Sequence, residues 1–158
     1  MKAGRAFAAG VAGGIVMSII LAMARGMGMP AQLEMLEGTM MLPPGPAAFW
    51  LGMMMHLIIS GVIGLIYGWG FEAVRRAGWV TGLGFGVIHA IIAGMAMGMM
   101  PMIHPRIPPM HAPGWFMSNI GMMGVAAMVM LHLIYGAVVG AIYGPVQHGV
   151  IETVRDGR

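Results

Sequence analysis

The chain has 158 residues, of which 59% are hydrophobic and only 8% are charged, with a formal net charge of +3. Because so few charged side chains cannot cover the surface of a soluble domain this large, the composition excludes an ordinary soluble protein. The basic residues are scattered, which argues against a nucleic-acid partner, and the lack of cysteine excludes disulfides and thiolate metal sites.

Four apolar segments are nearly free of charge and long enough to cross a hydrocarbon core about 30 Å thick. We expect membrane-spanning helices at about residues 6–26, 48–69, 79–100 and 118–144. The predicted fold is therefore an all-α, integral membrane four-helix bundle that forms a single domain over residues 1–158, with the lipid bilayer as its first partner.

The Lys and Arg residues predict how the bundle is oriented, because such residues are enriched in cytoplasmic segments. They precede the first span, separate the second from the third, and follow the fourth, at Lys2, Arg5, Arg75, Arg76, Arg155 and Arg158. The two remaining connections contain only Arg25 and Arg106. We expect a multi-pass protein of a prokaryotic inner membrane with both termini in the cytoplasm.

One motif occurs twice, in the second and the fourth span. "HLIISGVIGLIYG" begins at His56 and "HLIYGAVVGAIYG" begins at His132, and residues 54–68 share nine identities in fifteen positions with residues 130–144. The first and third spans align at an offset of 72 residues. We therefore predict a duplicated helical hairpin, with repeats at about 5–72 and 77–148 related by a pseudo-two-fold axis along the membrane normal.

Small residues recur at every fourth position in all four spans, as in Gly10, Gly14 and Ser18 of the first. Such small-xxx-small stripes let helix backbones approach closely, which is how helices associate in lipid. The stripes predict a compact bundle, and they could also serve a homo-oligomer or a larger membrane complex.

Three histidines lie inside predicted spans, at His56, His89 and His132, and Met17 is the repeat partner of His89. At about 1.5 Å per residue, each imidazole lies roughly 15–18 Å from the cytoplasmic end of its span, near the middle of the bilayer. Imidazole and thioether donors together suit copper, so we expect a metal-binding cluster of these four side chains. Three alternatives stay open: haem b with His56 and His132 as axial ligands, a role in proton or quinone chemistry, or histidines that only hydrogen-bond neighbouring helices.

The 22 methionines are also abundant in the predicted outer connections. The segment "MMPMIHPRIPPMHAPGWFM" contains six candidate copper ligands, which are Met99, Met100, Met102, His104, Met110 and His111. Thioether and imidazole groups in a cysteine-free segment predict a loop that collects copper. A structural loop that docks a partner is the alternative.

The repeated motif, with "AGVAGGIVMSIILAMARGMGMP" in the first span and "LHLIYGAVVGAIYG" in the last, resembles a loose family of small uncharacterised prokaryotic inner-membrane proteins with four spans. The resemblance implies the fold and the topology, and it brings no activity or catalytic residue.

No Ser–His–Asp set, phosphate loop or pair of carboxylates can be assembled, so we predict no catalytic residues. We expect a metal-handling protein, with copper as the first candidate; the alternatives are an accessory subunit of a larger membrane complex and a b-type haem protein.

Overall fold

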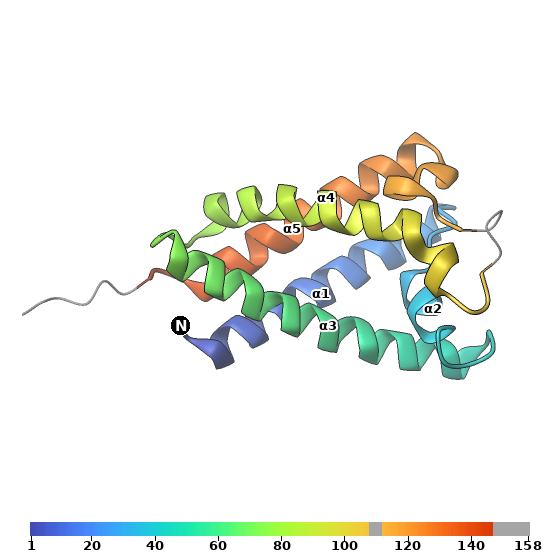
Figure 1. Ribbon diagram of the computed structural model, residues 1–158, viewed down its shortest axis with the longest axis horizontal. Coiled ribbons are helices and arrows are strands. Elements are labelled where there is room, and N and C mark those ends of the chain that lie inside the picture. Colours follow the sequence, from blue (N-terminus) through green and yellow to red (C-terminus); the bar gives the residue numbers. More distant parts are fainter. Residues whose placement is uncertain (108–111, 147–158) are drawn as a thin grey trace, which may run out of the picture.

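The computed structural model describes residues 1–107 and 112–146. Four long helices form it, α1 (Ala3–Gly26), α3 (Pro46–Ala73), α4 (Trp79–Ile103) and α5 (Met122–Tyr143). Each of the four is long and apolar enough to cross a membrane, which confirms the predicted all-α bundle. In Figure 1, α1 and α4 run in one direction and α3 and α5 run in the opposite direction.

Two short elements close the end of the bundle opposite the N-terminus, which we name the α2 end (Figure 1). They are the helix α2 (Leu33–Gly38) and the 3-10 helix η2 (Trp115–Ile120). The sequence predicted a loop in place of α2 and a fourth span that begins at 118. That span begins later, at Met122, because Gly121 adopts φ 84° and ψ −174°, which an α-helix does not allow, and the residues before it form η2.

Glycines bring the helices together in two tight pairs, α1 with α3 and α4 with α5. A Cβ atom at Gly10 would lie 2.9 Å from the Cα of Gly64, and one at Gly86 would lie 2.7 Å from the backbone oxygen of His132. Both distances are too short for a real side chain, so glycine is required at these crossings. The duplication of the hairpin stays a prediction from the sequence.

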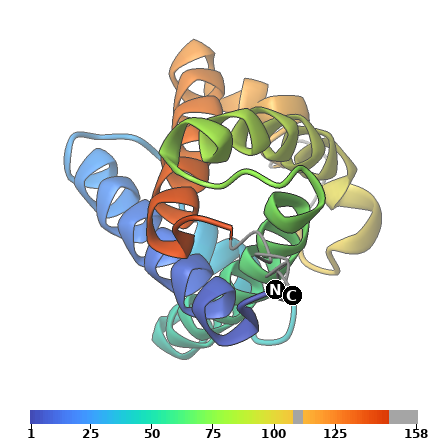
Figure 2. The ribbon, with the colours of Figure 1, turned by 90° about the vertical axis from the view of Figure 1, so that its left-hand side faces the viewer.

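The two pairs join through α1 and α5, where the ring of Tyr135 lies over Gly13. By contrast, α3 and α4 make few contacts with each other. They meet near the N-terminal end, where Phe85 of α4 packs against Tyr67 and Phe71 at ring-centroid distances of 5.6 and 5.2 Å. Figure 2 shows the bundle from this end, with the short α3–α4 connection in front.

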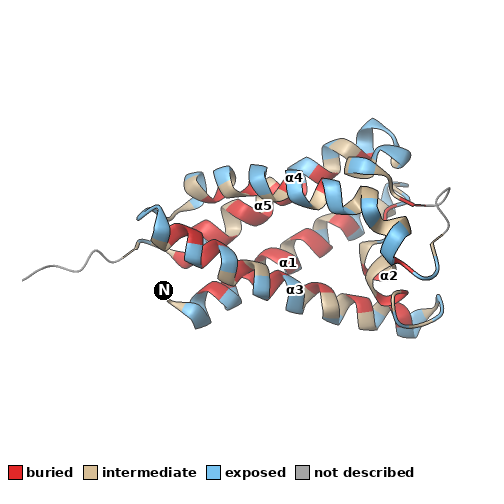
Figure 3. Cartoon of the chain, viewed as in Figure 1, coloured by how far each residue is buried: buried red, intermediate tan, exposed pale blue. Residues whose placement is uncertain are grey.

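The outer surface of the bundle is apolar. Buried residues face the inside of the bundle, and the outward faces of the helices are exposed (Figure 3). These outward faces include Ile19, Ile66 and Ile92, which are more than half exposed. The four tryptophans are exposed near helix ends, at Trp50, Trp69, Trp79 and Trp115. An apolar exterior with tryptophans near the ends is the pattern of helices in contact with lipid.

Candidate functional site

A cavity of about 680 Å³ occupies the half of the bundle nearest the α2 end. All four long helices contribute to its walls, as do α2 and η2. Three imidazoles and six thioethers line it, from His56, His89, His132, Met17, Met29, Met35, Met97, Met117 and Met128. The three histidines of the spans and Met17, expected to form one cluster, therefore line one cavity.

His89 and His132 form a close pair at the base of this cavity. Their ring centroids are 4.5 Å apart, and the rings are perpendicular. Nδ1 of His132 donates a hydrogen bond of 2.7 Å to the backbone oxygen of Met128, one turn earlier in α5. Because a carbonyl can only accept, this bond leaves Nε2 of the neutral ring as a free lone pair.

The ring of His89 is held by Tyr67, whose hydroxyl lies 3.3 Å from Nδ1. The contact joins α4 to α3. Over residues 1–107 and 112–146, neither the Nε2 atom of His89 nor that of His132 has a hydrogen-bond partner. Two imidazoles are thus oriented through one nitrogen each, and the second nitrogen of each remains available to a ligand.

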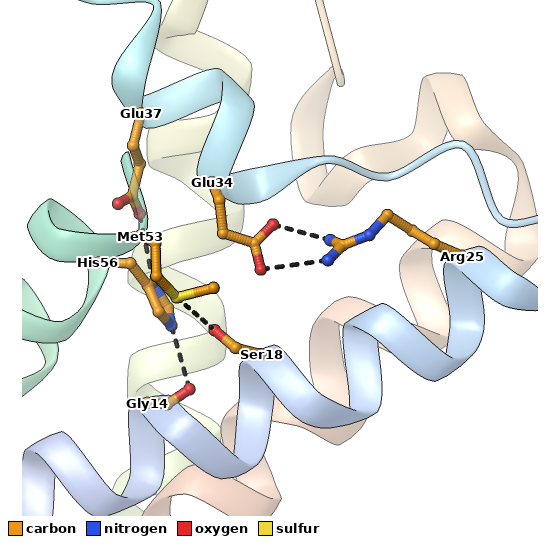
Figure 4. A network of polar contacts seen from close by, with 7 residues as sticks. All are labelled: Gly14, Ser18, Arg25, Glu34, Glu37, Met53 and His56. Atoms are coloured by element: carbon orange, nitrogen blue, oxygen red, sulfur yellow. Dashed lines mark hydrogen bonds and ion pairs between the residues drawn. The ribbon is translucent and has the colours of Figure 1, made fainter. Parts of the chain in front are cut away.

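His56 lines the same cavity but is engaged through both ring nitrogens (Figure 4). Its Nε2 lies 3.3 Å from the backbone oxygen of Gly14 in α1, and its Nδ1 lies 3.4 Å from Oε1 of Glu37 in α2. Both partners are acceptors, so the ring satisfies both only when it carries two hydrogens. A doubly protonated imidazole is a hydrogen-bond donor and not a metal ligand.

A buried ion pair fixes α2 beside this histidine. Arg25, at the end of α1, lies 2.7 Å from Glu34, whose side chain is 1% exposed (Figure 4). Close backbone contacts fix α2 from the other side, because a Cβ atom at Gly38 or Gly52 would overlap the backbone of the facing helix. These contacts hold Glu37 against His56.

The predicted copper-collecting residues lie elsewhere. Met99, Met100 and Met102 belong to α4 and not to a loop, since the helix continues to Ile103, and none of the three lines the cavity. His104 is buried between α4 and α2, where Nε2 lies 2.9 Å from the backbone oxygen of Leu36 and Nδ1 accepts from the amide of Arg106. Met110 and His111 lie outside the described residues.

The sequence gives little indication of two residues that contact the histidines, Glu37 and Tyr67. Glu37 reaches His56 only because α2 folds back onto α3, and Tyr67 reaches His89 across the α3–α4 connection. Because the chain has so few charged residues, the presence of a carboxylate at Glu37 could have suggested a specific partner for it.

The described part of the chain contains no group of three or more His, Asp or Glu side chains arranged to hold a metal ion. A metal at the histidine pair would therefore use two imidazoles and thioether sulfur. Such a ligand set suits a soft ion and not a hard one.

No curated protein and no solved structure matches this chain. A family model described as a family of unknown function, DUF6789, matches residues 1–150. This chain, with its α-helical bundle and histidine-lined cavity, therefore belongs to the DUF6789 family.

Proposed function

We propose that this protein binds a soft metal ion inside the membrane, with Cu(I) as the first candidate. The ligands would be Nε2 of His89 and Nε2 of His132, joined by sulfur from Met17 or Met128. The supporting observation is the histidine pair itself, with ring centroids 4.5 Å apart and each Nδ1 already anchored by a partner. A hydrogen bond on the second ring nitrogen, which fixes ring orientation, is the usual environment of a metal-binding histidine.

The methionines of the cavity provide a route for the ion. Met29, Met35 and Met117 come from segments at the α2 end, and the other three cavity methionines come from spanning helices. Thioethers are soft, uncharged ligands, so an ion could pass from one to the next without strong trapping. The exposed Met99 and Met102, with Met100, Met110 and His111, would collect copper outside the cavity. The hydrogen bonds of His104 assign that residue a structural role.

We infer that the protein lies in a prokaryotic inner membrane with its termini in the cytoplasm. Lys2 and Arg5 lie at the N-terminal end of the bundle, and Arg75 and Arg76 lie in the connection at the same end. At the α2 end, Arg25 is neutralised by Glu34. The excess of positive charge at the N-terminal end supports this orientation.

The structure gives less support to the two other functions considered. Haem b bound by His56 and His132 would require a free ring nitrogen on His56, and both are engaged. An accessory subunit or a homo-oligomer would use glycine stripes for association. Gly10, Gly64, Gly82 and Gly136 are already covered by helices of the same chain.

Copper binding can be tested on the purified protein in lipid nanodiscs by titrating Cu(I) against bathocuproine disulfonate. We expect one tightly bound ion, with nitrogen and sulfur ligands in X-ray absorption spectra. His89→Ala combined with His132→Ala should weaken binding more than about 100-fold, because loss of both imidazoles exceeds the effect of second-sphere changes. Unchanged affinity in the folded double variant would contradict the proposal.

A methionine pair supplies the matched control. Met97 lines the cavity, whereas Met95 lies on the same helix with 43% of its surface exposed and outside the cavity. Met97→Leu should slow copper entry, and Met95→Leu should leave it unchanged. Equal rates in the two variants would argue against the methionine route.

A further inference from the structure

The cavity is larger than a bound metal ion requires. Its volume of about 680 Å³ lies in the range of about 300–1,000 Å³ that is typical of sites for small organic molecules. Its walls include Leu21, Ile63, Ala93 and Leu131, which have no polar side-chain atoms. Such walls favour a ligand that is mostly apolar.

The cavity is placed for entry from the bilayer. Its walls include Ile59 and Ile63 of α3 and Ala93 and Met97 of α4. These two helices make few contacts with each other and meet near the N-terminal end, through Phe85. Ile59 of α3 lines the cavity and is also 43% exposed, so the cavity approaches the outer surface of the bundle at this residue. A molecule dissolved in the hydrocarbon core would reach the cavity between α3 and α4 without crossing water.

Polar groups at the base define the head group of the ligand. Nε2 of His132 is an acceptor, because Nδ1 already donates to Met128. The hydroxyl of Ser60, which also lines the cavity, has no side-chain hydrogen bond to the described part of the chain. A ligand hydroxyl could donate to the imidazole and accept from the serine. Glu37 faces His56, and the guanidinium of Arg106, which also lines the cavity, donates to the backbone oxygens of Thr39 and Met40 at the α2 end. Both charged side chains of the cavity therefore already have partners, which favours an uncharged head group at His132 and Ser60.

We propose that this cavity binds an uncharged, membrane-soluble organic molecule with a hydroxyl head group, which enters between α3 and α4. The head group lies at His132 and Ser60, and the apolar body lies along Ile63, Ala93 and Leu131. The proposal stands on the volume and walls of the cavity and does not require the metal. Ligand and metal would compete only for Nε2 of His132.

A photoreactive, diazirine-bearing fatty alcohol tests this binding in nanodiscs that contain the full chain, with metal removed by chelation. Mass spectrometry of the labelled peptides separates the cavity from the lipid-facing surface. We expect saturable labelling near Ile59 and Met97 that unlabelled hexadecanol displaces, and unsaturable labelling of exposed residues such as Ile92. The methyl ether of hexadecanol, which cannot donate to His132, should displace the probe at least tenfold less well.

Two alanines of α4 make a matched pair for the test. Ala93 lines the cavity, and Ala96, three residues later, is exposed and outside it. Ala93→Trp should lower saturable labelling at least tenfold, and Ala96→Trp should leave it unchanged. On α3, Ile63→Trp and the exposed Val62→Trp repeat the comparison, which guards against a variant that fails to fold.

Unsaturable labelling throughout, or equal labelling in the cavity-filling and surface variants, would overturn the proposal. Failure of the copper proposal looks different: the wild type would bind no Cu(I) and still show saturable labelling. Conversely, loss of the ligand proposal leaves Cu(I) binding by His89 and His132 intact.

Discussion

His56 and His132 begin two copies of one sequence motif, yet their surroundings differ. His56 contacts other segments through both nitrogens, Gly14 of α1 and Glu37 of α2. His132 bonds only its own helix, at Met128, and presents its other nitrogen to the cavity. The same motif therefore gives an imidazole engaged through both nitrogens in one half of the chain and an imidazole with one available nitrogen in the other.

The connecting segments explain the difference. Between α1 and α3 the chain forms α2, which brings a carboxylate to His56. Between α4 and α5 it forms η2, whose Trp115 and Phe116 rings lie over Gly98 and Gly94 of α4. No carboxylate from η2 faces His132, because its sequence WFMSNI contains none. The chemistry of each histidine is thus set by the segment that covers it.

The largest expected effect on the free energy of unfolding comes from breaking the ion pair that joins α2 to α1. Glu34→Ala leaves Arg25 without its carboxylate partner in a partly buried position. Breaking such a pair should lower the free energy of unfolding by about 3 kcal/mol, the lower end of the range for buried pairs since Arg25 is partly exposed. Thermal unfolding in nanodiscs measures it. The double variant Arg25→Met with Glu34→Met should recover most of the loss, and no recovery would refute the ion-pair explanation.

Glu37→Gln tests the comparison between His56 and His132 directly. It removes the carboxylate that contacts His56 and has no counterpart at His132. We expect the loss of a charge-assisted contact to cost about 1.5–3 kcal/mol. Nitrogen-15 NMR of labelled histidine should show His56 doubly protonated at neutral pH in the wild type and neutral, like His132, in the variant. A neutral His56 in the wild type would be incompatible with the assignment.

Tyr67→Phe removes the anchor of His89 and tests the other side of the comparison. The lost hydrogen bond should cost only about 1 kcal/mol in stability. Cu(I) affinity should fall about 10–100-fold, as expected when an outer partner of a metal-binding histidine is removed. Tyr135→Phe is the control, because its hydroxyl donates to the backbone oxygen of Ser60 and not to a histidine. If both variants lose copper equally, the anchoring role of Tyr67 is wrong.

Met102→Leu should have the smallest effect. Met102 is 80% exposed at the end of α4, so the change in stability should stay within about 0.5 kcal/mol. Cu(I) affinity at the histidine pair should also be unchanged, although the rate of uptake should fall if this residue collects the ion. A loss of affinity would place the binding site at the end of α4 and not in the cavity.

Much of the fold could be predicted, because long charge-free segments predict spanning helices and small residues at every fourth position predict their close packing. The six residues of α2 could not, since a segment this short owes its helix to packing on α3 at Gly52. The late start of α5 follows from the non-helical angles at Gly121, and the sequence does not distinguish this glycine from the many that lie inside helices.

The histidines show the same limit. Helical spacing predicted that His56, His89 and His132 face the inside of the bundle, and all three line a single cavity. Their hydrogen-bond partners could not be predicted, because Glu37 and Tyr67 arrive from separate segments. The availability of each ring nitrogen is a property of the tertiary structure.

The arrangement of the helices as two glycine-packed pairs has a consequence for how the protein assembles. The connection between α3 and α4 is short, and Arg75 within it adopts a left-handed φ of 55°. Each pair already has its own close crossing, and Tyr135 joins them across Gly13 and Ser60. A chain severed at the Arg75–Arg76 bond should therefore reassemble when its two fragments are co-expressed, as two preformed hairpins.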